Sequence, residues 1–174
     1  MKKSVLLAGI VLMLADSAAA EKDNVHFSGA LVAETCTLPD ADTDIKLDFG
    51  AVIGKDLYQY QRTKSQPFTI HLQNCDPDMM STVNVTFQGL ADPALTDMLA
   101  LDASSTAKGV AIGIELPGGT LLPVNKASPW KQLAKGNNEL TFNAFVQAQP
   151  VVIANKTLVS GDFTATTTFV LNYQ

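Results

Sequence analysis

Apolar residues recur at every second position in several short stretches of the chain, with polar or small residues between them. This period of two is typical of β-strands that bury one face. The pattern predicts strands at 25–33, 45–49, 68–72, 83–87, 110–116, 140–146 and 163–173.

Turn residues separate these stretches. Leu116–Pro123 contains Gly118 and Gly119, which we expect to supply positive φ angles in a hairpin, and Gly136–Asn138 is a second predicted turn. Asp92–Ala103 predicts a short helix, because an N-cap candidate and a proline precede apolar residues at helical spacing. Short strands without a linker or repeat predict one all-β domain, a β-sandwich of immunoglobulin type.

The first twenty residues predict a secretory signal peptide. Two lysines precede the apolar run Ser4–Ala15, and Ala18 and Ala20 form an Ala-x-Ala cleavage site. The alternative, a membrane anchor, would need about 20 apolar residues to cross the bilayer. We therefore expect residues 21–174 to form the exported protein.

The chain is acidic. Its formal net charge is −5, and loss of Lys2, Lys3 and Asp16 with the signal peptide makes it −6. An acidic protein without a basic cluster is not expected to bind nucleic acid or an anionic membrane surface.

Two cysteines remain after export, Cys36 and Cys75. An isolated pair in an exported protein predicts a disulfide, and its 39-residue loop would be worth about 4 kcal/mol in the chain-entropy model. A metal site is the alternative. It would need further ligands, and His26 and His71 do not lie at the usual spacing.

Motifs for catalysis are absent from the sequence, which has no nucleophile elbow, zinc-protease helix, phosphate loop or EF-hand. We therefore expect no enzymatic activity and no cofactor. The acidic run Asp40–Asp44 is read as a solvated loop rather than a calcium site. Tyr58, Tyr60 and Trp130 are the candidates for stacking on a sugar, with packing or surface roles as the alternative; we expect Trp130 to cover an edge of the core.

Several features together resemble the structural subunits of chaperone–usher pili, the family of type 1 and P fimbriae. Tyr173 is next to last and Gly161 is fourteenth from the end, with alternating apolar residues between them. Cys75 lies in an L-x-N-C setting, and Met98–Leu101 followed by Gly109–Val124 is similar to the middle of a pilin. Val25–Cys36 is similar to the N-terminal extension of these subunits.

The resemblance implies an incomplete immunoglobulin-like sandwich of six strands, which lacks its last strand. Donor-strand complementation, a known form of β-augmentation, would complete it with a strand from another chain. The implied acceptor groove and chaperone-binding strand comprises Gly161, Phe163, Ala165, Thr167, Phe169, Leu171 and Tyr173. The implied donor strand comprises Val25, Phe27, Gly29, Leu31 and Ala33, because Asp23 breaks the apolar row before it.

The resemblance also implies a domain order, partners and a location. Residues 1–20 would be the signal peptide, 21–35 the donor extension and 36–174 the pilin domain. The implied partners are a periplasmic chaperone, an outer-membrane usher and other pilus subunits, in a homo- or heteropolymer. The protein would pass through the periplasm to an adhesive pilus on the cell surface, as a non-catalytic structural subunit.

Three other functions stay open at this point. The chain could be a fibre-tip adhesin or glycan-binding module, although its length leaves no room for a separate lectin domain. It could be a secreted enzyme on a sandwich scaffold, which nothing but export supports. It could also be a complete immunoglobulin-like domain, stable without any partner strand.

Overall fold

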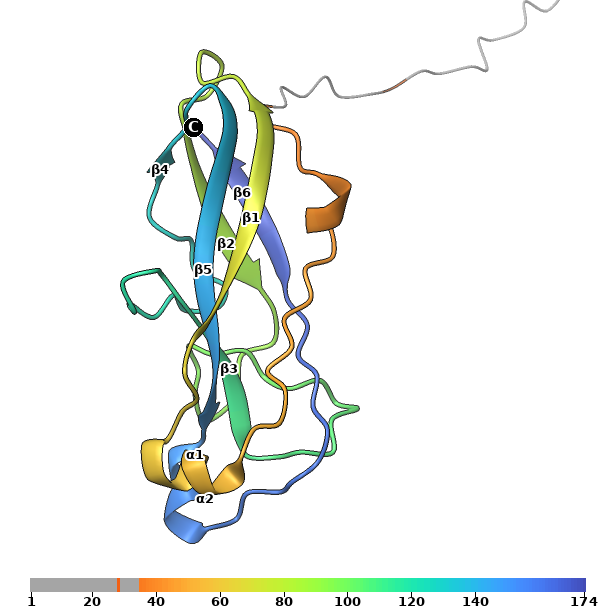
Figure 1. The fold of residues 1–174 in the computed structure, drawn as a ribbon, viewed down its shortest axis with the longest axis vertical. Helices are drawn as coiled ribbons and strands as arrows, with labels where there is room; N and C mark the ends of the chain where they lie inside the picture. Colours follow the sequence, from red (N-terminus) through yellow and green to blue (C-terminus); the bar gives the residue numbers. More distant parts are fainter. Residues whose placement is uncertain (1–27, 29–34) are drawn as a thin grey trace, which may run out of the picture. The chain divides into compact units, whose positions relative to one another are not determined.

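Two three-stranded antiparallel sheets form the protein. The computed structural model describes Ser28 and residues 35–174. One sheet has the order β1-β5-β3 and the other the order β4-β2-β6 (Figure 1). The strands are β1 Gln66–Cys75, β2 Thr82–Gln88, β3 Val110–Glu115, β4 Lys131–Gln132, β5 Gly136–Ala148 and β6 Thr168–Tyr173. Little of the described chain is helical: η1 Asp40–Asp42, α1 Gly54–Tyr60 and α2 Pro150–Asn155.

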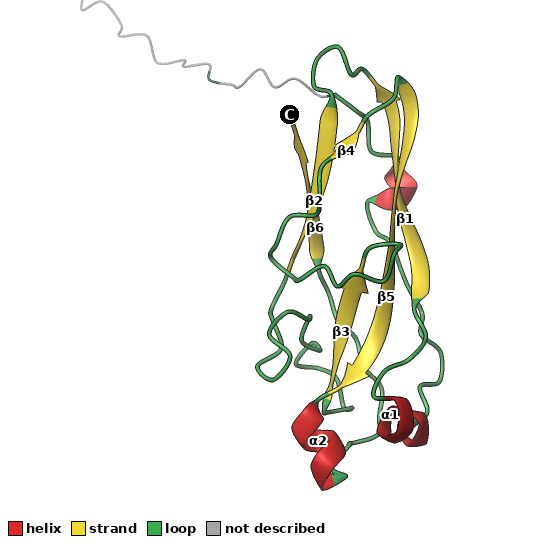
Figure 2. Ribbon diagram, turned by 90° about the vertical axis from the view of Figure 1, so that its left-hand side faces the viewer, coloured by secondary structure: helices red, strands yellow, loops and turns green. Residues whose placement is uncertain are grey.

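The predicted all-β sandwich is confirmed. Figure 2 shows the two sheets as separate layers, and one core cluster takes side chains from both of them. The alternating residues of β1, β2 and β5 point inward and bury Ile70, Val83, Val85 and Leu140. Phe87 of one sheet meets Phe142 of the other edge to face, with ring centroids 5.0 Å apart. Aromatic contact of this kind stabilises the packing of one layer on the other.

Helices α1 and α2 lie together at one end of the sandwich (Figure 1). β5 ends there, just before α2, and the Ala148 amide bonds to the Gln61 carbonyl just after α1. At the other end the β1–β2 turn lies near the C-terminus, where Thr82 and Gln174 exchange backbone hydrogen bonds. We call these the helical end and the turn end.

Several predicted elements differ from the structure. Residues 45–49 are extended but belong to no strand, and of residues 163–173 only Thr168–Tyr173 pair in a ladder. No helix forms at Asp92–Ala103, although the Asp92 carboxylate does accept hydrogen bonds from the Ala94 and Leu95 amides, as an N-cap would. In the Leu116–Pro123 turn Gly119 has a positive φ of 81°, whereas Gly118 does not.

Candidate functional site

The last segment of the chain presents a half-buried apolar row. Side chains at odd positions from 163 to 173 are half-buried, and those at 164, 166, 168 and 172 are exposed. Phe169, Leu171 and Tyr173 pack on the core cluster around Val83 and Leu140, whereas Phe163 and Ala165 pack on the cluster around Ile112. The row therefore runs along both halves of the core without being covered.

The backbone of this segment is paired on one side. Thr82 and Gln174 exchange both hydrogen bonds, and the register sets Asn84 opposite Asn172 and Thr86 opposite Val170. Hydrogen-bonded pairs alternate in an antiparallel ladder, so even-numbered residues of β6 bond to β2. The N–H and C=O groups of Phe169 and Leu171 consequently point to the opposite edge.

The loop Asp102–Thr106 continues this pairing along residues 162–166, which precede β6. The Asp102 amide donates to the Thr164 carbonyl at 2.8 Å, and the Thr166 amide donates to Oδ1 of Asp102 at 3.2 Å. The Thr164 amide donates to the Ser105 hydroxyl, which donates to the Thr164 carbonyl in return. The backbone and side chains of the loop thus replace a neighbouring strand, again on the side of the even-numbered residues.

A second extended segment runs through residues 44–52. Ile45, Leu47 and Phe49 are half-buried and alternate with exposed residues. Their side chains pack on the same two core clusters as the last segment, and the rings of Phe49 and Phe163 lie 6.4 Å apart. Within the described part of the chain, residues 44–52 make no backbone–backbone hydrogen bond.

Both ends of this second segment are fixed. Thr37 exchanges two backbone hydrogen bonds with Gln73, and Cys36 forms a disulfide with Cys75. The carboxylate of Asp42 accepts from the backbone amide of His71 and lies 2.8 Å from its Nδ1. At the other end α1 begins and buries Leu57. The acidic run is thus not simply solvated, because Asp42 is buried.

We call the half-buried side chains of residues 45–49 and 163–173 the apolar seam. Buried main-chain groups need hydrogen-bond partners, and an open strand edge can pair with another chain. The seam combines such an edge with incompletely covered apolar side chains. This arrangement suits the binding of an extended peptide that supplies both backbone bonds and side chains.

The predicted acceptor residues come together in this seam, except for Gly161. Gly161 lies against Thr106, where an added Cβ would be 2.3 Å from the Thr106 hydroxyl oxygen. The predicted donor residues Val25, Phe27, Gly29, Leu31 and Ala33, and the predicted signal peptide, lie outside the described residues. The sequence pattern did not single out the Asp102–Thr106 loop, although its clustered Asp, Ser and Thr side chains are typical backbone partners.

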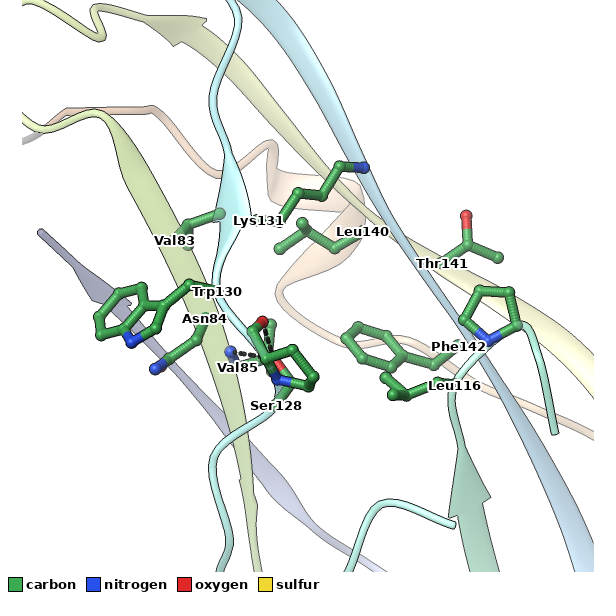
Figure 3. Close-up of a pocket in the computed structure, with 12 residues that line it drawn as sticks. Val83, Asn84, Val85, Leu116, Ser128, Trp130, Lys131, Leu140, Thr141 and Phe142 are labelled. Atoms are coloured by element: carbon green, nitrogen blue, oxygen red, sulfur yellow. Dashed lines mark hydrogen bonds between the residues drawn. The ribbon is translucent and has the colours of Figure 1, made fainter. Parts of the chain in front are cut away.

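The candidate sugar-stacking residues do not form one site. Tyr58 accepts a hydrogen bond from the Leu158 amide through its hydroxyl, while Tyr60 is exposed near the helical end. Trp130 is 47% exposed and stands at the rim of a 270 Å³ cavity that reaches core residues Val83 and Phe142 (Figure 3). The cavity lies at the β4–β2 side of the sandwich, away from β6.

Comparison with known proteins identifies the family. Residues 25–174 match the family described as "Fimbrial protein". The chain belongs to the fimbrial protein family. It is 30% identical to the "Major MR/P fimbria protein" of Proteus mirabilis (strain HI4320), in an alignment that covers 100% of this chain and 99% of the relative.

Solved structures of fimbrial proteins share the fold. The P pilus rod subunit PapA superposes with a TM-score of 0.69 at 24% identity, over 81% of this chain and 100% of PapA. A chain from a chaperone–usher pilus gives a TM-score of 0.68 at 24% identity, over 92% of this chain and 100% of that one.

This fimbrial protein is a structural subunit of a pilus on the cell surface, as predicted. Its family is one of structural fimbrial subunits, and other pilus subunits are its partners. None of the helices in the described residues is long and apolar enough to cross a membrane.

Proposed function

We propose that the apolar seam accepts an extended strand from another chain and that this subunit polymerises by donor-strand exchange. One observation carries the proposal. Phe169 and Leu171 each have a half-buried apolar side chain, and their main-chain N–H and C=O groups lie at the edge of β6 that does not face β2. A strand laid between β6 and residues 44–52 would pair with both.

The donor for the next subunit is the chain's own segment Val25, Phe27, Gly29, Leu31 and Ala33. Its alternating residues have the period that a strand needs to place side chains in the seam. Burial of Val25, Phe27 and Leu31 would contribute about 5–9 kcal/mol before the cost of ordering the strand. Residues 1–20 are removed on export, 21–35 form the extension and 36–174 form the receiving domain.

Before assembly a periplasmic chaperone lends a strand to the same seam, and an outer-membrane usher then guides the exchange. The subunit would need a chaperone to cover the seam, because exposed apolar side chains beside an open strand edge promote aggregation. Binding and strand exchange are the whole activity of the subunit, which catalyses no reaction.

The test uses the mature chain and a synthetic peptide of residues 21–35. The wild-type peptide should raise the thermal midpoint of the chain, whereas a peptide with Phe27→Asp and Leu31→Asp should not. A Leu171→Asp subunit should lose the response to the wild-type peptide, since the new carboxylate would face the inserted strand.

Thr168→Asp is the matched control, because Thr168 lies on the same strand with its side chain exposed. That variant should respond like the wild type. A peptide response that persists in Leu171→Asp would show that the strand binds elsewhere and would overturn the proposal.

A further inference from the structure

An apolar cleft opens at the helical end, next to the seam. It has a volume of 560 Å³ and is lined by Phe49, Val52 and Leu57 together with the more exposed Ile53 and Tyr60. Ile53 is 59% exposed and Tyr60 is 63% exposed. Large side chains that are this exposed, beside a cleft, are typical of a contact surface.

Exposed lysines lie at the edge of this cleft. Lys64 is one of its lining residues, and Lys55 lies on α1 beside the lining residue Asp56. Asp56 is the acidic residue of the lining, and the charge of Arg62 is already engaged by Glu115 at 3.1 Å. An incoming partner would therefore meet a positive rim around an apolar hollow.

The turn end, in contrast, carries acidic side chains. The β1–β2 turn contains Asp76 and Asp78, and Met79 at its tip is 55% exposed. Lys135 lies close by, before Gly136 that pairs with Cys75, but the two carboxylates outnumber it. The Asp76 amide donates to the Thr35 carbonyl, so the turn lies directly beside the residue where the N-terminal extension joins the domain.

We propose that the cleft at α1 receives the β1–β2 turn of a second copy of this chain. Met79 of that copy would fill the apolar hollow, and Asp76 and Asp78 would face Lys55 and Lys64. The inference rests on the proposed strand exchange and adds a contact between the two domains themselves.

The N-terminal extension is short, so the β1–β2 turn of the donating copy must lie near one end of the receiving copy. Only Glu34 and Thr35 separate Ala33, the last residue of the donor strand, from Cys36, the first residue of its own domain, which is a span of about 10 Å. A donor antiparallel to β6 would end at the helical end, because β6 runs from there toward the turn end. The acidic turn would then meet the basic cleft.

A parallel donor would end at the turn end and bring two acidic turns together, which like charges oppose. Antiparallel pairing also matches the strand pairs already present in both sheets. Charge complementarity and pairing geometry thus select the same arrangement. Because the inserted strand tethers the two domains, even a weak contact is made at high effective concentration.

Charge exchange tests this contact. The rate of polymerisation of the mature chain is followed by light scattering at low salt. Lys64→Asp and Asp78→Lys alone should each slow it about fivefold, and a chain that carries both should recover to within about twofold of the wild type. Met79→Asp should also slow it, whereas Lys126→Asp, an exposed lysine in the loop before β4, should not.

Binding of the 21–35 peptide separates this inference from the strand exchange on which it rests. The peptide lacks the β1–β2 turn, so the Lys64 and Asp78 variants should bind it like the wild type. Equal polymerisation rates in both single variants, with normal peptide binding, would overturn the contact at α1. Loss of peptide binding by the wild-type chain would instead overturn the strand exchange.

Discussion

At the scale of single residues, Gly161 shows how a small side chain can position a functional segment. The apolar seam has two walls, residues 45–49 and residues 163–173, and the second wall begins just after Gly161. At Gly161 the backbone passes so close to Thr106 and Ala107 that a Cβ would lie 2.9 Å from the Ala107 amide nitrogen. Thr106 also holds Asp162 through its hydroxyl. The glycine thus permits the contact that starts the wall in register.

We predict that Gly161→Ala destabilises the domain by about 1–3 kcal/mol, because the added methyl group would displace the backbone or Thr106. Urea unfolding of the mature chain measures the effect. Gly118→Ala is the control, since a Cβ there meets no described atom within 4 Å and φ is not positive. Equal stability of the two variants would show that the loop yields without cost.

At the scale of elements, the Asp102–Thr106 loop takes the place of a strand. It holds Thr164 and Thr166 through side-chain acceptors, whereas the β2 backbone holds the even-numbered residues farther along. The first half of the wall should therefore depend on the loop's side chains and the second half should not.

Amide hydrogen exchange can separate the two halves. In Asp102→Ala the Thr166 amide loses its acceptor, and we expect it to exchange about tenfold faster, as the loss of about 1.4 kcal/mol would produce. The amide of Val170, which faces β2, should keep its rate. Faster exchange at both sites would mean that the variant loosens the whole strand.

The period of two predicted the strands well where the chain supplies a neighbour for them. It identified β1, β2, β3 and β5 and the half-buried row from Phe163 to Tyr173. It overpredicted a strand at Ile45–Phe49, because alternation reports which side chains face the core and says nothing about backbone partners. That segment has the pattern of a strand but makes no ladder within the described chain.

The helices were not predictable from the same pattern. α2 has six residues, several of them β-branched, so its intrinsic propensity is poor, and only Pro150 at its start is a helix signal. α1 is a single short helix that buries only Leu57. Asp92 carries a true N-cap signal, yet its bonds close a turn that does not continue as a helix.

At the scale of the whole molecule, the disulfide connects the seam to the sandwich. Cys36 precedes residues 44–52, which have no ladder of their own in the described chain, and Cys75 ends β1. The bond thus restrains the unfolded chain and also fixes the start of one wall of the seam.

We predict that Cys36→Ser with Cys75→Ser lowers the free energy of unfolding by up to about 4 kcal/mol, the loop-closure value for this separation. Thermal and urea unfolding of the mature chain give this number. The double variant should also bind the 21–35 peptide more weakly, because the segment of Ile45 to Phe49 loses an anchor. Unchanged affinity would show that Thr37 and Asp42 suffice to hold that wall.

The direction of the open edge has a mechanical consequence for a fibre. In the proposed fibre, a strand inserted antiparallel to β6 would follow the seam along its whole length. Each sandwich would then contact its two neighbours at opposite ends. Tension on the fibre would then pull the strand along its own axis. Its hydrogen bonds would be loaded together in shear rather than opened one after another, so the joint between subunits should resist sudden force better than a strand that peels away from one end.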